Sequence, residues 1–218
     1  MKITKFRSLV QGLILAVFLA TAVQAADEKK KDMSADMHAQ MEKMQKLGTP
    51  GAGHEVLKPA EGVWTVKSKS WMNPGDKAQE STGTAKMEWV LDGRFLKQEF
   101  KGSWKDHTGK DVQFEGIGYT GYDNMTEKYT STWMDSMMTG MFVSNNGNFN
   151  ASKKTITDEG NFSCPMTGEA KKWFKSEWKI DPKKNKQTFT MYMKDEKGKE
   201  YKSMVMEYTK NQDTASKV

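Results

Sequence analysis

The sequence predicts an all-β protein, a ten-stranded antiparallel up-and-down β-barrel with a short N-terminal helix. From Glu61 to Thr209, short runs of alternating aromatic and polar residues are separated by turn residues about every 8 to 17 positions. No helix-sized segment interrupts these runs, and a meandering sheet of this length usually closes on itself. A single cysteine excludes an internal disulfide, so the fold depends on its sheet and its core.

Residues 1–25 have the pattern of a signal peptide. Three basic residues within the first seven positions precede an apolar run that ends at Ala20, and Val23-Gln24-Ala25 supplies the small residues that a signal peptidase reads. The apolar run is short for a membrane span. We expect cleavage after Ala25, no stable membrane insertion of the mature protein and a periplasmic or secreted location. An uncleaved anchor is the alternative.

Residues 26–60 are predicted to form a charged linker and a Met-rich amphipathic helix. The helix runs from Met33 to about Lys46, and apolar residues on one face recur every three or four positions. They are Met33, Met37, Met41, Met44 and Leu47. Such a stripe predicts a partner surface, most simply the outside or an open end of the barrel. A second short helix is expected from His54 to Pro59.

Residues 61–210 are predicted to form one β-barrel domain, and residues 211–218 a disordered tail. The expected strands are Gly62–Met72, Ser81–Leu91, Arg94–Trp104, Asp111–Tyr122, Tyr129–Asp135, Gly140–Asn150, Lys154–Phe162, Lys171–Ile180, Thr188–Lys194 and Glu200–Thr209. Turn residues separate them, and Asp92-Gly93 is the signal for a tight two-residue hairpin. A domain of this length builds one core rather than two.

Alternation within the strands assigns candidate inner faces, because successive strand residues point to opposite sides of a sheet. The residues placed inside are Trp64 and Val66 in the first strand, Leu96, Phe100 and Trp104 in the third, and Phe189, Met191 and Met193 in the ninth. Some strands carry bulky groups on both faces, so the rest of the lining is left open.

The charge balance argues against nucleic-acid binding. The whole chain carries a net charge of +6, and loss of residues 1–25 leaves 31 basic and 28 acidic residues, a net charge of +3. The lysines are scattered among strands and turns and form no basic helix or stripe. We expect no nucleic-acid partner.

The lone cysteine, Cys164, has no partner within the chain. Beside Pro165 it is expected to act as a small, partly buried hydrophobic residue. A reactive thiol or a disulfide-linked dimer is the alternative, and the choice between monomer and homodimer stays open.

Two motifs resemble catalytic or nucleotide-binding signatures. Gly116-Ile117-Gly118-Tyr119-Thr120-Gly121 has dinucleotide-binding spacing, but that chemistry requires the glycines to open a helix. Here they lie within an expected strand, where glycines favour a bend or the close approach of a neighbouring side chain. Ser176 and Lys179 have the Ser-x-x-Lys spacing, yet residues three apart on a strand point to opposite sides. We assign no catalytic residues.

Metal and cofactor sites are not expected from the histidines. The three histidines, His38, His54 and His107, lie on separate elements, so we predict no shared metal site and no cofactor. The methionines give an alternative, since thioethers select Cu(I) and comparable soft ions such as Ag(I). An envelope metal-handling or stress protein would use Met33, Met37, Met41 and Met44 with His38, and a second methionine group lies at Met134, Met137, Met138 and Met141.

The leading interpretation is a non-enzymatic barrel that binds a small apolar or amphipathic ligand in its interior. The candidate ligand-binding residues are Trp64, Arg94, Phe100, Glu115, Trp133, Asp135 and Met191. An inward-facing charge needs a partner or a polar ligand. The alternative is therefore an enzyme that uses Arg94 with Glu115 or Asp135.

Several segments together resemble the domain of unknown function 1579 family. They are Gly62-Val63-Trp64, Met72-Asn73-Pro74-Gly75, Gly93-Arg94-Phe95-Leu96, Phe114-Glu115-Gly116-Ile117-Gly118, Gly121-Tyr122-Asp123-Asn124, Thr132-Trp133-Met134-Asp135 and Pro165-Met166-Thr167-Gly168. The resemblance spans about Gly51 to Lys210. It implies a calycin-like barrel similar to lipocalins, fatty-acid-binding proteins and nitrobindin-type domains, and it implies no activity.

Two details of this resemblance bear on function. Nitrobindin-like barrels bind haem through a histidine late in the chain, and this sequence has no histidine after His107. The resemblance therefore implies no comparable haem ligand. Gly62-x-Trp64 resembles the first-strand signature of lipocalin-like barrels, which implies that Trp64 packs over the closed end.

Overall fold

A computed structural model of the chain describes residues 33, 35–106 and 108–211. The expected signal peptide, the charged residues 26–32, His107 and the tail from residue 212 onward lie outside these residues. Among the residues described, no helix is long and apolar enough to cross a bilayer. The segment before Pro50 and the barrel form separate compact units.

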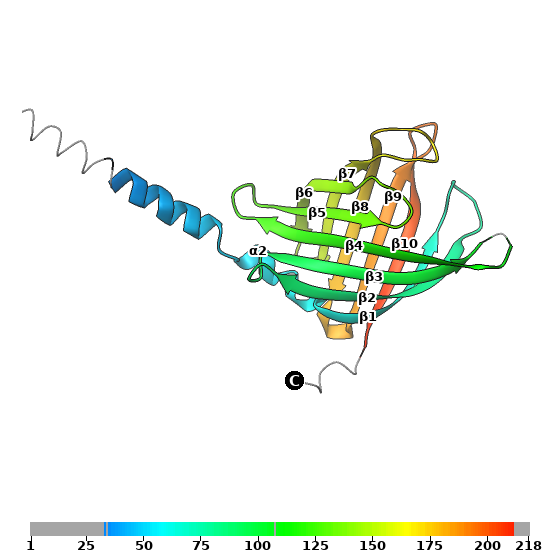
Figure 1. Cartoon of the computed structure of the whole chain (residues 1–218), viewed down its shortest axis with the longest axis horizontal. Helices are drawn as coiled ribbons and strands as arrows, with labels where there is room; N and C mark the ends of the chain where they lie inside the picture. Colours follow the sequence, from blue (N-terminus) through cyan, green and yellow to red (C-terminus); the bar gives the residue numbers. More distant parts are fainter. Residues whose placement is uncertain (1–32, 34, 107, 212–218) are drawn as a thin grey trace, which may run out of the picture. The chain divides into compact units, whose positions relative to one another are not determined.

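The barrel consists of ten antiparallel strands that close on themselves (Figure 1). The strands are β1 (Gly62–Ser70), β2 (Gln79–Val90), β3 (Phe95–Lys105), β4 (Asp111–Asp123), β5 (Lys128–Asp135), β6 (Phe142–Asn150), β7 (Thr155–Phe162), β8 (Lys172–Asp181), β9 (Lys186–Lys194) and β10 (Glu200–Lys210). Each strand pairs with its chain neighbours, and β1 pairs with β10, from Trp64 opposite Lys210 to Ser70 opposite Met204. The predicted ten-stranded up-and-down barrel is confirmed.

The hairpin between β2 and β3 differs from the prediction. The last strand pair is Val90 with Phe95, so the loop has four residues rather than the two of Asp92-Gly93. Leu91, Asp92 and Gly93 all have positive φ, at 50°, 55° and 79°. Because the reversal uses three left-handed residues, β2 ends one residue before the predicted end and β3 begins one residue after the predicted start. Arg94 therefore belongs to the loop.

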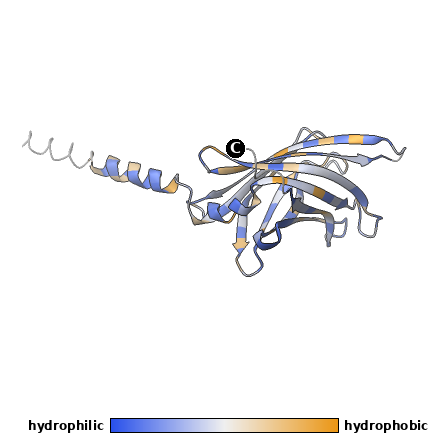
Figure 2. Cartoon of the chain, turned by 90° about the horizontal axis from the view of Figure 1, so that it is seen from below, coloured by the Kyte–Doolittle hydropathy of each residue, from blue (hydrophilic) through white to orange (hydrophobic). Residues whose placement is uncertain are grey.

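The inner faces follow the predicted alternation. Along β1, Trp64 and Val66 are buried while Thr65 and Lys67 are exposed. Hydrophobic and hydrophilic residues are mixed along the same strands (Figure 2). Inside the barrel, buried side chains form two hydrophobic clusters. The first contains Trp64, Val66, Leu96, Phe100, Ile156 and Ile180, among others. The second contains Phe162, Phe174 and Met191.

One end of the barrel is covered by the segment that precedes β1. This segment contains α2 (Ala52–Glu55) and the 3-10 helix η1 (Lys58–Ala60), in place of the single helix expected from His54 to Pro59. Leu57 and Ala60 are fully buried in the first cluster. The indole N–H of Trp64 donates a 2.8 Å hydrogen bond to the Ala60 carbonyl, and this bond fixes the segment to the end of β1.

The Met-rich segment is helical, as predicted, at residues 33 and 35–47. Its four methionines are exposed, by 56 to 70%. The partner surface of this stripe stays a prediction.

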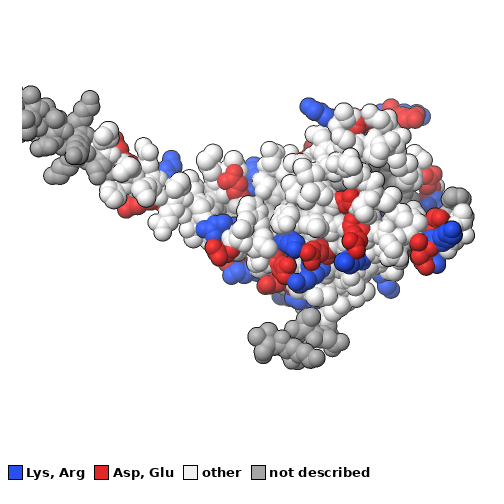
Figure 3. Space-filling model, in the orientation of Figure 1, with Lys and Arg blue, Asp and Glu red and all other residues white. Residues whose placement is uncertain are grey.

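Charges on the barrel are mixed in sign. Figure 3 shows lysines, arginines and carboxylates interspersed over one face. Many of them pair across strands, as Lys101 does with Glu115 at 3.1 Å.

Candidate ligand-binding interior

The indole of Trp133, on β5, lies against the glycines of β4. A Cβ atom built on Gly116 would lie 2.2 Å from Cζ2 of Trp133, and one on Gly118 would lie 2.9 Å from Cε3. The dinucleotide-like run from Gly116 to Gly121 is therefore part of a strand, and its first two glycines allow the predicted close approach of a side chain.

Two further rings lie on glycines in the same way. A Cβ on Gly83 would come within 2.5 Å of the Phe100 ring, and one on Gly102 within 2.8 Å of it. On the other side of the barrel, a Cβ on Gly160 would come within 2.7 Å of the Phe174 ring. Aromatic rings thus lie close against the backbone of the inner wall at positions where only glycine leaves room for them.

Phe114 packs against three of the neighbouring rings, and together they form what we call the aromatic wall, on the inner face of β3, β4 and β5. Its members are Phe100, Trp104, Phe114 and Trp133. The ring centroid of Phe114 lies 5.7 Å from that of Phe100, 6.1 Å from that of Trp104 and 6.5 Å from that of Trp133. Phe114, Trp104 and Trp133 are only partly buried. The wall therefore presents apolar surface that water reaches.

Asp135 ends this wall. Its Oδ2 accepts a 2.9 Å hydrogen bond from Nε1 of Trp133, and its Oδ1 accepts one from the backbone N–H of Met137, also at 2.9 Å. The carboxylate fixes the indole against β4 and starts the turn that follows β5.

The interior also contains a buried carboxylate, Asp158 on β7, which is 7% exposed. Ser176 Oγ donates to its Oδ1 at 2.5 Å. Ser144 Oγ and Ser131 Oγ lie 2.7 and 3.2 Å from its Oδ2, and they lie 2.8 Å from each other. The four residues, from four consecutive strands, form what we call the Asp158 cluster.

The Asp158 cluster lies between the two hydrophobic clusters. Asp158 shares its face of β7 with Ile156 of the first hydrophobic cluster and with Phe162 of the second. An irregularity in the pairing of β6 lies beside it, where a Cβ on Gly147 would be 3.4 Å from that of Asp158. Along the inner face of β7, the polar Asp158 cluster therefore separates the first hydrophobic cluster from the second.

Asp158 is not among the ligand-binding residues predicted from the sequence. The available signal was its position in Ile156-Thr157-Asp158-Glu159-Gly160-Asn161-Phe162, where period two places a carboxylate on the apolar face. Its three serine partners come from other strands, and no local pattern connects them.

The structure brings together three of the predicted ligand-binding residues. Phe100, Trp133 and Asp135 lie on or beside the aromatic wall. Trp64 is 1% exposed in the closed end and Met191 is 7% exposed in the second hydrophobic cluster, so both belong to the interior without joining that wall.

Arg94 and Glu115 are not part of the interior. Arg94 donates to the Leu91 carbonyl at 3.1 Å within its own loop, and Glu115 is an exposed partner of Lys101 on the outer face. Lys101, which is opposite Glu115, is seven positions from Arg94, or about 23 Å at the usual strand rise. The pairing of these two residues in an active site is not supported by this geometry.

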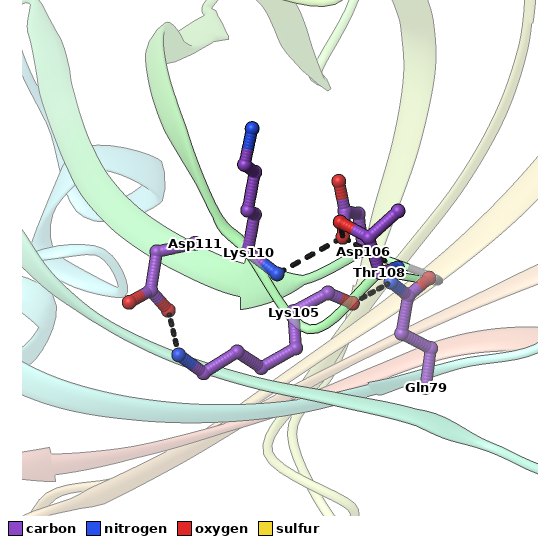
Figure 4. A network of polar contacts seen from close by, with 6 residues as sticks. All are labelled: Gln79, Lys105, Asp106, Thr108, Lys110 and Asp111. Carbon is purple, nitrogen blue, oxygen red and sulfur yellow. Dashed lines mark hydrogen bonds and ion pairs between the residues drawn. The ribbon is translucent and has the colours of Figure 1, made fainter.

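The hairpin between β3 and β4 is held by a polar network (Figure 4). Oδ1 of Asp106 accepts hydrogen bonds from the backbone N–H groups of Thr108 and Lys110, at 2.8 and 3.0 Å, and from the Thr108 hydroxyl. The Thr108 hydroxyl, with smaller help from the backbone donors, lowers the pKa of Asp106 despite some desolvation. Lys105 pairs with Asp111 at 2.9 Å at the base of the hairpin.

The described histidines and acidic residues give no metal site. No group of three His, Cys, Asp or Glu side chains suitable for a metal occurs in the part of the chain that the structure describes. His54 is buried in the closed end, where its Nδ1 accepts a 3.1 Å hydrogen bond from the Gly51 N–H. Burial and the charge of Arg94 lower its pKa, against a smaller opposite effect of Glu55.

Cys164 is partly buried, as predicted, and it packs against the second hydrophobic cluster. Burial opposes its ionisation, yet hydrogen bonds from Thr167 and Met166 and the charge of Lys172 bring its pKa below the usual value.

A single antiparallel sheet of ten strands that closes on itself has the architecture of an up-and-down β-barrel. The chain belongs to the family described as "Protein of unknown function (DUF1579)", whose model matches residues 49–210.

Among solved structures, the chain is similar to Rv2717c from M. tuberculosis. The TM-score is 0.52 at 14% sequence identity, and the match covers 75% of this chain and 100% of that one. At this identity the likeness concerns the fold alone. No curated protein compared with the chain matches it.

Proposed function

We propose that this protein is a non-enzymatic binding protein that takes a small apolar or amphipathic molecule into its barrel. The observation that carries the proposal is the aromatic wall, in which Phe114, Trp104 and Trp133 are only partly buried. Partly exposed apolar side chains on the inside of a barrel are what an apolar ligand would cover, with a gain of about 25 cal/mol per Å².

A titration with N-phenyl-1-naphthylamine, a neutral apolar fluorophore, tests this proposal. We expect a saturable rise in fluorescence with one site per chain. Ser68→Phe places a ring on the inner face of β1 and is expected to weaken binding at least about tenfold, because the ring would occupy space that the fluorophore needs. Lys67→Phe, on the outer face of the same strand, is the matched control. Equal affinities of the two variants would place the fluorophore outside the barrel and contradict the proposal.

We also propose that the protein is exported, on the basis of the residues 1–25. N-terminal sequencing of the protein recovered from the periplasmic or extracellular fraction is expected to begin at Ala26. A chain that retains its first residues and stays with the membrane would point to an uncleaved anchor instead.

A second candidate function is binding of Cu(I) or Ag(I) by the Met-rich helix. The observation in its favour is that Met33, Met37, Met41 and Met44 are exposed on successive turns, so their thioethers are accessible to a soft cation. His38, also exposed, lies beside them.

Competition with a Cu(I) chelator tests this second function. The full chain is expected to compete more strongly than a variant in which these four methionines are leucine. A variant that changes Met125, Met166 and Met72, three exposed methionines of the barrel, serves as the control. If the leucine variant competes equally well, the helix has no such function.

A further inference from the structure

We infer that the interior ligand carries an amine or ammonium group, and that the Asp158 cluster is the subsite that accepts it. This inference rests on the proposed function, since it names the class of molecule that the interior takes. It is carried by the arrangement of hydrogen-bond donors and acceptors in the cluster.

The cluster uses all its hydroxyl hydrogens on itself. Each serine has one O–H: Ser176 gives its hydrogen to Oδ1 of Asp158, and Ser144 gives its hydrogen to Oδ2. Ser131 shares its hydrogen between Oδ2 and the Ser144 oxygen. The cluster then has acceptors to offer and no side-chain donors.

One acceptor position of the carboxylate stays open. A carboxylate accepts about four hydrogen bonds, and the three hydroxyls place two on Oδ2 and one on Oδ1. Oδ1 therefore accepts one side-chain hydrogen bond fewer than Oδ2.

The negative charge of the cluster has no basic partner. Within the described part of the chain, none of the ion pairs includes Asp158. A buried charge is stable when it is paired as well as hydrogen-bonded. A ligand ammonium would supply the missing charge and the fourth donor, while a ligand carboxylate would be repelled.

The surroundings of the cluster define the rest of the ligand. Apolar side chains flank it on both sides, Ile156 and Ile180 in the first hydrophobic cluster and Phe162 and Phe174 in the second. Ser144, Ser176 and Asp158 are buried, with 4, 5 and 7% of their surface exposed, so only a group that enters the barrel interior would reach them. The matching ligand is an amphipathic amine with an apolar body.

Three probes of equal chain length test the inference on the full chain: decylammonium, decanol and decanoate, each below its micelle-forming concentration. We measure their displacement of N-phenyl-1-naphthylamine at neutral pH. Decylammonium is expected to bind at least about tenfold more tightly than decanoate, because a hydrogen bond to a charged group is among the stronger ones. This comparison requires no variant.

Two substitutions of one strand then locate the effect. Asp158→Asn is expected to remove the preference for decylammonium, with at least about a tenfold loss in its affinity. Glu159→Gln, the next residue and an exposed one, removes the same charge from the outer face and is expected to change nothing. Ser176→Ala keeps the carboxylate and frees Oδ1 further, so the preference should persist.

The outcomes separate the inference from the proposed function. If decanol or decanoate binds as tightly as decylammonium, or if Asp158→Asn keeps the preference, the inference is wrong and interior binding stands. If Asp158→Asn does not fold, a preference for decanoate in Ser176→Ala would overturn the inference equally. If no probe displaces the fluorophore, both the inference and the proposed function fail.

Discussion

The indole of Trp133 on β5 covers its diagonal neighbour Gly116 on β4 at a distance that leaves no room for a side chain on the glycine. A Cβ on Gly116 would lie 2.2 Å from the indole of Trp133, whose N–H is fixed by Asp135. The indole cannot withdraw without losing that hydrogen bond, so the two residues depend on each other.

Gly116→Ala is expected to lower the free energy of unfolding by about 1–3 kcal/mol, the usual cost of overpacking a core. Trp133→Leu in the same chain should recover part of this loss, since it removes the clashing ring. Urea unfolding of the two single variants and the double variant measures the coupling.

The control for this cycle is Gly51→Ala. Nothing lies within 4 Å of a Cβ at Gly51, and we expect a change below about 0.5 kcal/mol. Additive effects of Gly116→Ala and Trp133→Leu would show that the two residues do not interact as described.

Trp64→Phe is expected to loosen the closed end of the barrel. The variant removes the 2.8 Å hydrogen bond to the Ala60 carbonyl, which costs about 1–2 kcal/mol of unfolding free energy. Hydrogen exchange of the amides of η1 should accelerate. Trp173→Phe, which loses an exposed 3.2 Å hydrogen bond to Glu159, is the control, and equal losses in both variants would contradict the role of Trp64.

His54 makes stability depend on pH in the acidic range. Burial and Arg94 lower its folded-state pKa below 6.5, so below pH 6.5 the unfolded chain binds the proton that the folded chain does not. Its contribution to stability is complete above pH 6.5 and declines as the pH falls through the folded-state pKa. Unfolding free energies measured from pH 7.5 to 5 should therefore fall, and His54→Gln should flatten the curve.

A curve of the same slope in His54→Gln would assign the acid sensitivity to other groups. His38→Gln is the matched control, because His38 is exposed on the helix.

Two buried tyrosines are expected to ionise at a higher pH than an exposed tyrosine. Burial raises the pKa of Tyr129 and of Tyr208 to about 12, with a smaller contribution from Tyr122 at Tyr129 and an opposing one from Gln98 at Tyr208. Because both pKa values are raised on folding, the contribution of the two tyrosines to stability is complete below about pH 10, the pKa of tyrosine in the unfolded chain. This contribution is lost as the pH rises towards 12. When the absorbance of the tyrosinate band is followed as the pH rises, part of the increase should occur near pH 12. Tyr208→Phe should reduce that part. A single transition near 10 in the folded chain would contradict this burial.

The strands could be predicted from the sequence, but the polar side chains that meet inside the barrel could not. Each predicted strand end lies within two residues of the observed one, because turn residues and alternation are local signals. Burial of Trp64, Phe100 and Met191 followed from the same alternation. The loop position of Arg94 depends on the left-handed conformation of Leu91, a residue type that rarely adopts it. The Asp158 cluster depends on four strands at once, so only the closed barrel reveals it.

Quenching of tryptophan fluorescence by 10-bromodecanol tests the central claim, that the barrel binds ligands against its aromatic wall. Of the seven tryptophans, Trp104 and Trp133 line that wall, so quenching should saturate and should be mostly lost in Trp104→Phe/Trp133→Phe. Trp173→Phe should retain it. Quenching that never saturates, or that persists undiminished without Trp104 and Trp133, would contradict the claim.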